Sequence, residues 1–396
     1  MEFKAEYVPE RRGHFPEKWI AGMKLENEIV WKNPNEKDFI VGKVGERFDG
    51  PLFHQYPDEK AHGHVGLREF HHRTFSFPSI INAEGNEIFL SAKGVGVHHD
   101  LEVESAGNPM RGDEGYLGLY DLDSAQYDKD HALLLESFDC RIAKPVAIIK
   151  LNELPSWARN EGTQVNSIAE LKKLGVLKPD FDPVVYIRSA ISDTRVEDIC
   201  NVKNVNSLNP HNIEKIKKEI DRIAGALAGE VGKKMNPKEY VEWFVQTAAT
   251  SLGKLHKNGY VHRYIHAGNM TIAGELIDFD SVEKAEYEED ENLKDLTKLD
   301  KDGNPTSKKG KEFARDIEQS EEGDVVELGI LNICRKMAET VVQLYPEAFG
   351  IKKNEATMLI FEEYFPEIDK MFWENYVREC PENKYLESTQ IYVNLT

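Results

Sequence analysis

The chain has 396 residues, of which 40% are hydrophobic and 30% charged, and its formal net charge at pH 7 is −20. This length is enough for one two-lobed catalytic unit or two domains with a large core. The excess of negative charge argues against nucleic-acid binding, because a polyanion needs a basic face, and against adhesion to an anionic membrane.

The sequence also lacks the signals of secretion and membrane insertion. No apolar run approaches the length that spans a bilayer, and the N-terminal stretch MEFKAEYVPERRGHF has no apolar core. The four cysteines are scattered without any CxxC spacing, which is typical of reduced thiols. We therefore expect a cytoplasmic protein that acts as a monomer, with no nucleic-acid or membrane partner.

Residues 1–84 are rich in aromatic residues, His, Pro and Gly, and are predicted to form an N-terminal extension of short strands and loops packed on the N-lobe. Seven of the 13 histidines lie between residues 54 and 99: His54, His62, His64, His71, His72, His98 and His99. Their spacings match no familiar pattern of metal ligands. We interpret them as surface and packing histidines, with a metal cluster as the alternative.

Residues 85–205 are predicted to form a β-rich N-lobe. In this region, residues 87–93 form a strand that ends in Lys93 and is followed by Gly94 and Gly96. A lysine at a strand end can reach an α- or β-phosphate, and glycines allow the backbone to approach it. The motif therefore indicates a nucleotide site.

The segment 129–138 is a strong helix former with Leu at successive positions, which predicts a buried helix that contains Glu136. A buried carboxylate needs a cationic partner, and Lys93 is the natural candidate. We expect Lys93→Ala to weaken ATP binding with little loss of fold, because a lysine at a cleft carries function more than packing. A central strand is predicted over 145–149.

Two arginines, Arg188 and Arg195, lie at the end of a further predicted strand and shortly after it. The strand 184–188 ends at Arg188, and Arg195 follows seven residues later. Between the two predicted strands, Ser167 and Glu170 form a capping box, which predicts the start of a short helix.

Residues 206–396 are predicted to form a helical C-lobe. Helical periodicity is present in four segments: 212–228, 238–257, 325–344 and 356–379. The polar stretches 286–291 and 300–311 are predicted to be solvated loops.

Asn269 and Asp278 carry the chemistry of the C-lobe. The segments 270–272 and 276–277 are apolar or β-branched, and Gly274 lies between them, which predicts a tight β-hairpin. One polar residue enters the hairpin and one leaves it, so their oxygens can converge on Mg²⁺, with Mn²⁺ as an alternative ion. Kinase-fold phosphotransferases have this layout. The alternative is an ordinary buried hairpin with an Asn turn and a capping Asp.

These features together resemble selenoprotein O-like proteins, a kinase-fold family that transfers AMP from ATP to protein hydroxyls. The resemblance is carried by Lys93 with Gly94 and Gly96, by Glu136, by Arg188 and Arg195, by Gly259–His262, and by the Asn269–Asp278 hairpin. It implies an α+β, protein-kinase-like fold with two lobes, in which the Lys and Glu pair, the two Arg bind ATP phosphates, and the Asn and Asp hold the metal.

The chain departs from this family at one position that matters for catalysis. The acidic residue expected directly before the metal-binding Asn is Gly268 here. The stretch around it also resembles aminoglycoside-phosphotransferase-like kinases, whose catalytic Asp falls on Tyr264. On both resemblances the usual carboxylate base is missing.

Three nearby residues could replace the missing base: His262, His266 and Asp280. His262 is expected to brace the loop, and Asp280 could serve as a second metal ligand. His266 is our predicted catalytic base, because a neutral imidazole has a suitable proton affinity near pH 7.

The predicted function is therefore an ATP- and Mg²⁺-dependent nucleotidyltransferase that moves AMP to a hydroxyl of a protein or small molecule. The first alternative is a small-molecule or protein kinase of the same fold. The second is a nucleotide-binding pseudokinase. The pair of arginines favours AMP transfer, and the missing carboxylate favours the pseudokinase.

Overall fold

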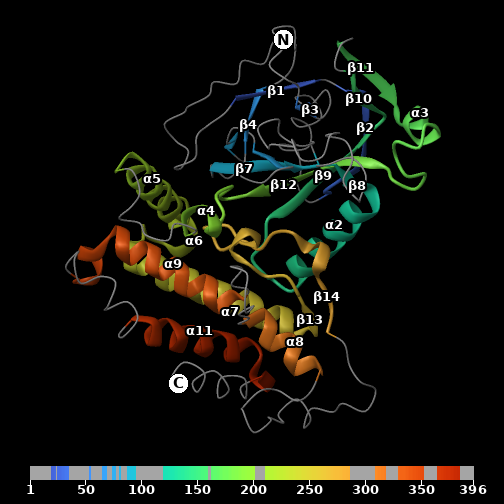
Figure 1. Ribbon diagram of the computed structural model, residues 1–396. Coiled ribbons are helices and arrows are strands. Elements are labelled where there is room, and N and C mark those ends of the chain that lie inside the picture. Colours follow the sequence, from blue (N-terminus) through green and yellow to red (C-terminus); the bar gives the residue numbers. More distant parts are fainter. Residues whose placement is uncertain are drawn as a thin grey trace, which may run out of the picture. The chain divides into compact units, whose positions relative to one another are not determined.

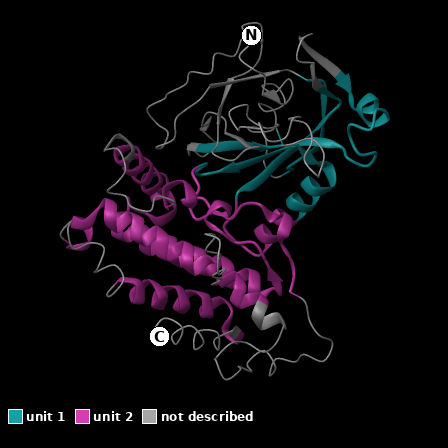
Figure 2. Cartoon of the chain, viewed as in Figure 1, with its two compact units in different colours: residues 1–130, 143–193 teal, residues 131–142, 194–396 magenta. Residues whose placement is uncertain are grey.

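The computed structural model describes residues 19–23, 25–34, 53–54, 65–68, 74–76, 80–81, 87–94, 119–158, 162–200, 210–285, 308–317, 329–351 and 364–383 (Figure 1). The chain divides into two compact units, one made of residues 1–130 and 143–193 and the other of residues 131–142 and 194–396 (Figure 2). A sheet dominates the first unit and helices dominate the second, which confirms the predicted α+β class. The division does not coincide with the predicted boundaries at 84/85 and 205/206.

One antiparallel sheet forms the first unit. Its strands are β1 (Trp19–Met23), β2 (Asn27–Lys32), β3 (Phe53–His54), β4 (Val65–Arg68), β5 (Thr74–Ser76), β6 (Ile80–Ile81), β7 (Glu87–Lys93), β8 (Tyr120–Asp121), β9 (Lys144–Leu151) and β12 (Pro183–Ala190). The strand order is β2-β9-β12-β7-β5-β4-β1-β3, with β6 paired to β7 and β8 paired to β12. The described strands of the predicted N-terminal extension therefore belong to the same sheet as β7.

Shorter elements complete the first unit. Strands β10 (Glu153–Ala158) and β11 (Gly162–Ser167) form a separate hairpin that leads into helix α3 (Ile168–Lys173). At the start of α3, Ser167 Oγ accepts a hydrogen bond of 3.2 Å from the backbone N–H of Glu170, as the predicted capping box requires. Helix α2 (Leu122–Ser137) follows β8 directly, and the predicted helix at 129–138 is its second half.

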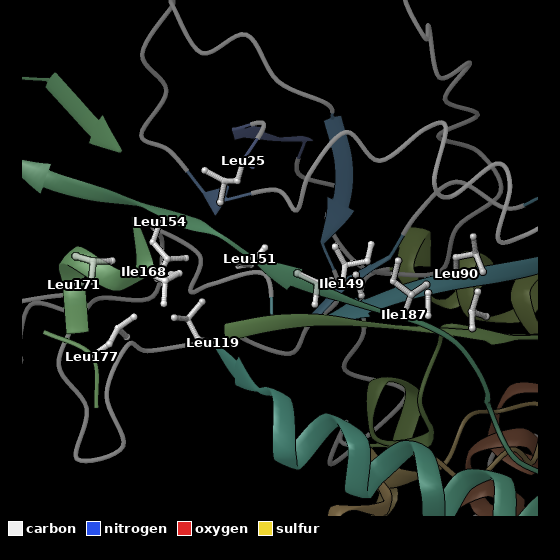
Figure 3. Close-up of a cluster of buried hydrophobic side chains, with 14 residues drawn as sticks. Leu25, Leu90, Leu119, Ile149, Leu151, Leu154, Ile168, Leu171, Leu177 and Ile187 are labelled. Carbon is white, nitrogen blue, oxygen red and sulfur yellow. The ribbon is translucent and has the colours of Figure 1, made fainter. Parts of the chain in front are cut away.

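Most consecutive residues of the central strands β9 and β12 are buried. Because successive side chains of a strand point to opposite sides, both faces of these strands are covered. Val185 and Ile187 of β12 join one apolar cluster, shown in Figure 3, whose members also include Leu90 and Ile149. Their neighbours Val184 and Tyr186 join a second cluster, which contains Tyr120 of β8 and Ala125 of α2. The polar side chains at the end of β7 lie on this second face.

The second unit is built around a long helix. Its helices are α4 (Val196–Cys200), α5 (Pro210–Ala226), α6 (Ala228–Val231), α7 (Pro237–Lys257), α8 (Lys308–Ile317), α9 (Ile330–Leu344) and α11 (Phe365–Glu379). Helix α7 packs against both α9 and α11 (Figure 1). It buries Tyr240, Phe244 and Leu252 on its inner side, as the periodicity predicted. The predicted loop over 300–311 is wrong at its end, because α8 begins at Lys308 and buries Phe313 and Ile317.

Two further expectations can be compared with the described residues. None of the described helices is long and apolar enough to cross a bilayer. All four cysteines are free thiols, and Cys140, Cys334 and Cys380 are buried. Among the seven N-terminal histidines, His54 lies in β3, where only its backbone is described, and the other six lie outside the described residues.

Candidate functional site

The predicted hairpin of the second unit is present. The backbone N–H of Thr271 donates to Glu275 O (2.9 Å), and that of Gly274, at φ +71°, donates to Thr271 O (2.9 Å) to close the turn. At the open end, the N–H of Ile277 donates to Asn269 O (3.0 Å). This bond places the backbone of Asn269 directly across from the residue that precedes Asp278.

Asn269 and Asp278 are both held in defined conformations. Asn269 is 5% exposed, and its Nδ2 donates to the carbonyl oxygen of Tyr264 (2.9 Å), so the amide oxygen is the end of the side chain left for another ligand. Asp278 is half-buried and adopts a left-handed backbone conformation with φ +62°. Such a conformation is uncommon for residues other than glycine and is tolerated best by Asn and Asp.

The donor set of this pair fits Mg²⁺. An amide oxygen and a carboxylate are hard ligands, and Mg²⁺ usually binds one or two such protein groups together with water and substrate phosphates. Within the described ranges, no group of three or more His, Cys, Asp and Glu side chains is arranged to hold a metal ion. A metal role for Asn269 and Asp278 is thus a two-ligand site and stays a prediction.

A buried carboxylate anchors the start of the loop 262–269, which leads into the hairpin. Asp316 of α8 is 1% exposed, and its two oxygens accept the backbone N–H groups of His262 (2.6 Å) and Arg263 (2.9 Å). His256 of α7 lies 3.3 Å from the same carboxylate through Nε2 and contacts the hydroxyl of Tyr376 through Nδ1 (2.7 Å). The sequence-based predictions did not include Asp316. An acidic residue on the buried side of an amphipathic helix could have indicated it, because such a residue needs a polar partner.

His262 braces the loop at a second point, as expected. Its side chain is fully buried, and Nδ1 lies 3.3 Å from Ser281 Oγ, directly after the hairpin. The loop is thereby tied to elements on both sides of the hairpin.

Arg195 is tied to the same loop. Its Nη1 donates to Gly268 O (2.9 Å), its backbone N–H donates to Asp198 Oδ2 (2.6 Å), and it pairs with Thr271 as an isolated antiparallel bridge. The side chain is 5% exposed. The arginine predicted to bind phosphate therefore supports the backbone directly before Asn269.

His266 caps the short 3-10 helix η4 (Ala267–Asn269). The backbone N–H of Gly268 donates to its Nδ1 (3.0 Å), and Glu197 Oε2 lies 3.9 Å from the same nitrogen. Burial is the main cause that lowers the pKa of His266 below its ordinary value of 6.5, while the nearby Glu197 opposes the shift. The neutral form is therefore favoured near pH 7, as the predicted base role requires, and that role stays a prediction.

In the first unit, Lys93 lies on the same face of the sheet as Tyr186 and the predicted site residue Arg188. Lys93 is opposite Tyr186 in the ladder of β7 and β12, and Arg188 follows Tyr186 on the same face. Arg188 is 2% exposed, with its guanidinium carbon 5.9 Å from the centre of the Tyr186 ring. Arg188 and Arg195 belong to different units.

Lys93 forms an ion pair with a carboxylate that the sequence did not point to. Lys93 Nζ lies 3.7 Å from Asp128 Oδ2 and 4.4 Å from the centre of the Tyr120 ring, and the two charged side chains are 2% and 0% exposed. Glu136 lies two turns further along α2, about 12 Å along the helix axis. Asp128 is therefore a carboxylate partner of Lys93, and the predicted pairing with Glu136 stays a prediction.

Gly94 has a conformational reason to be glycine. Its φ is +97°, and a Cβ there would lie 2.5 Å from the carbonyl oxygen of Val184 and 2.7 Å from Tyr120 Cβ. The residue allows β7 to end tightly against β12 and β8, and its predicted contact with phosphate stays a prediction. Gly96 lies outside the described residues.

The element order defines the class of fold. A strand-end lysine with a helical carboxylate partner is followed by a helical unit whose anchored loop and hairpin carry Asn269 and Asp278. These parts occur in this order in protein-kinase-like folds. The chain thus has an α+β, protein-kinase-like fold with a sheet-rich unit and a helical unit.

Comparison with known proteins adds three solved structures. WaaP in complex with acyl carrier protein is 10% identical, with 88% of this chain and 99% of that chain covered and a TM-score of 0.26. The Toxoplasma gondii specific rhoptry antigen kinase domain is 9% identical, with coverages of 84% and 83% and a TM-score of 0.31. ROP2 from Toxoplasma gondii, a virulence factor with a protein-kinase fold and no enzymatic activity, is 8% identical, with coverages of 91% and 88% and a TM-score of 0.31.

At these identities and TM-scores, the three structures do not assign this chain to a family. No protein-family model and no curated protein matches the sequence.

Proposed function

We propose that this protein is an ATP- and Mg²⁺-dependent nucleotidyltransferase that moves AMP to a hydroxyl of a protein or small molecule. The observation that supports the proposal is the hairpin whose open end carries Asn269 and, directly after Ile277, Asp278. The loop before it is anchored by the buried carboxylate of Asp316. Burial of a charged group costs free energy, and an ordinary turn does not require it.

The chain's own residues supply position and charge. Asn269 and Asp278 would hold the metal, which would supply positive charge to neutralise the phosphates. Lys93 is the first unit's candidate for a phosphate, and its pairing with Asp128 fixes the direction of its side chain. Arg195 keeps the carbonyl before Asn269 in place. Such positioning supplies most of the catalysis in phosphoryl-type transfer.

Transfer of phosphate, as in a kinase of the same fold, is the second candidate. It is favoured by the contact of Arg195 with the loop backbone, because an arginine engaged in that way is less available to bind ATP phosphates together with Arg188, which was the reason to favour AMP transfer. A nucleotide-binding pseudokinase is the third candidate, and it is favoured by the absence of an acid at Gly268 and Tyr264.

The decisive measurement is the intact mass of the protein and of candidate acceptors after incubation with Mg-ATP. An increase of one adenylyl group supports AMP transfer, an increase of one phosphoryl group supports the kinase, and binding without any modification supports the pseudokinase.

A matched pair of variants tests the metal role. Asp278→Asn removes the charge at a left-handed position that Asn tolerates, so it should abolish Mg²⁺-dependent ATP binding without unfolding the protein. Asp139→Asn makes the same change at another left-handed aspartate of the second unit and should leave binding intact. Equal ATP affinity of wild type and Asp278→Asn, measured by calorimetry, would remove Asp278 from the metal site.

A further inference from the structure

A carboxylate fills the space beside Gly268, although the loop itself contributes none there. A Cβ added to Gly268 would lie 2.5 Å from Glu197 Oε2, 2.7 Å from Glu197 Cδ and 2.6 Å from His266 Cε1. Gly268 is the position at which the resemblance to selenoprotein O-like proteins implies an acid. Glu197, from the short helix α4, thus places its carboxylate where a side chain at 268 would begin.

The two residues directly before Glu197 are tied to the loop and hairpin. The N–H of Val196 donates to Met270 O (2.9 Å), and Arg195 Nη1 donates to Gly268 O (2.9 Å). Asp198 accepts the N–H of Arg195 (2.6 Å), which fixes the start of α4. The Glu197 side chain is 19% exposed, so it is positioned by its neighbours and is still partly open to solvent.

The hydrogen bond of His266 limits what the histidine itself can do. A backbone N–H is always a donor, so the Nδ1 that receives the Gly268 N–H must be the unprotonated nitrogen, and the proton of the neutral ring is then on Nε2. To accept a further proton at Nδ1, His266 would have to give up the cap of η4. An ionised carboxylate is an acceptor at both oxygens and carries no such restriction.

We propose that Glu197 is the catalytic proton acceptor, a carboxylate supplied by α4 in place of the missing loop acid. The proposal rests on the proposed transferase function. As the oxygen of the acceptor hydroxyl bonds to phosphorus, the hydroxyl proton passes to Glu197, and the bond to pyrophosphate (in AMP transfer) or to ADP (in phosphoryl transfer) breaks. Glu197 then releases the proton to solvent. His266 and Arg195 are positioning residues that hold the loop.

The first test removes the charge and keeps the shape. Glu197→Gln should lower turnover about 10²- to 10⁴-fold, the usual contribution of a general base, while the affinity for Mg-ATP measured by calorimetry stays as in wild type. Glu214→Gln, at an exposed glutamate of α5 in the same unit, is the matched control and should keep the wild-type rate.

The second test moves the carboxylate back to the loop. Gly268 is not among the described glycines with positive φ, so its backbone accepts a side chain, and the obstacles are the Glu197 carboxylate and His266 Cε1. In a Glu197→Ala background, Gly268→Asp should recover at least part of the lost turnover, whereas Gly268→Asp alone should lower it.

The third test requires no catalysis. Gly268→Ala should lower the Tm of the nucleotide-free wild type more than that of Glu197→Ala, because the second background removes two of the three atoms that the new methyl group would meet, Glu197 Oε2 and Cδ, and leaves only His266 Cε1. An equal loss of Tm in both backgrounds would overturn the placement of Glu197.

The outcomes separate this inference from the proposed function. A wild-type protein that transfers groups, together with fully active Glu197→Gln, overturns the role of Glu197 and leaves the proposed function standing. A wild-type protein that binds Mg-ATP and modifies neither itself nor any acceptor overturns the proposed function, and the role of Glu197 with it.

Discussion

The buried pair of Lys93 and Asp128 makes a strong prediction about stability. Lys93→Met keeps a long unbranched side chain and removes the positive charge that lies 3.7 Å from the buried Asp128 carboxylate. The two side chains are 2% and 0% exposed, so solvent screens the pair very little. Leaving one charge of such a pair uncompensated costs about 3–5 kcal/mol.

This magnitude should be visible in thermal unfolding. A domain of 150–250 residues loses about 2–4 °C of Tm per kcal/mol, so Lys93→Met should lower the Tm of the nucleotide-free protein by about 6–20 °C. The sequence alone predicted little loss of fold on removal of Lys93. The structure changes that expectation, because this lysine contributes to the packing of the sheet as well as to any phosphate contact.

A double-mutant cycle identifies the partner. Combining Lys93→Met with Asp128→Asn should cost less than the sum of the single changes, with a coupling on the order of 1–3 kcal/mol. The same cycle with Glu136→Gln should give a coupling near zero, because Glu136 lies two turns away on α2. The assignment fails if Lys93→Met has the wild-type Tm, or if the coupling is found with Glu136.

Three further predictions concern other parts of the chain. Gly94→Ala should destabilise the protein in urea unfolding by more than Gly232→Ala, because both have positive φ but only the Cβ at 94 would meet other atoms; equal losses would contradict the close approach of β7 and β12. Two lysine side chains hydrogen-bond the Asp182 carboxylate and hold its pKa below 3.8, so its stabilisation is present above about pH 4 and is lost as the pH falls through the lowered value. The stability difference between wild type and Asp182→Asn should therefore shrink in acid, and a difference that grows there would refute this sign. Arg195→Lys should slow turnover even with saturating ATP, since a lysine does not reproduce the guanidinium fork that contacts Gly268 O, and full activity would show that the contact is dispensable.

Local patterns in the sequence determined most of the secondary structure. The strand at 87–93 was predicted with its observed bounds, and the helix at 238–257 was predicted to within one residue at its start. The tight hairpin around Gly274 was also predicted. These elements depend on alternation, helical periodicity and turn residues within a few positions, which a sequence displays directly.

The partners of the site residues were decided by tertiary structure. Asp128 and Glu136 are both acids in one helical segment, and only the packing of α2 on the sheet selects the one beside Lys93. Asp316 reaches the loop at His262 across 54 residues of sequence.

The carboxylate beside Gly268 is the clearest case of a partner that only the tertiary structure decides. The sequence shows a missing acid at this position, whereas the fold brings α4 to the loop and puts Glu197 into the vacant space. Arg195, which ties α4 to the loop, is 73 residues from Gly268. A sequence pattern records what each segment can form by itself, but the distance between side chains of different segments is fixed only when the segments pack, because packing sets their register and the direction of each side chain.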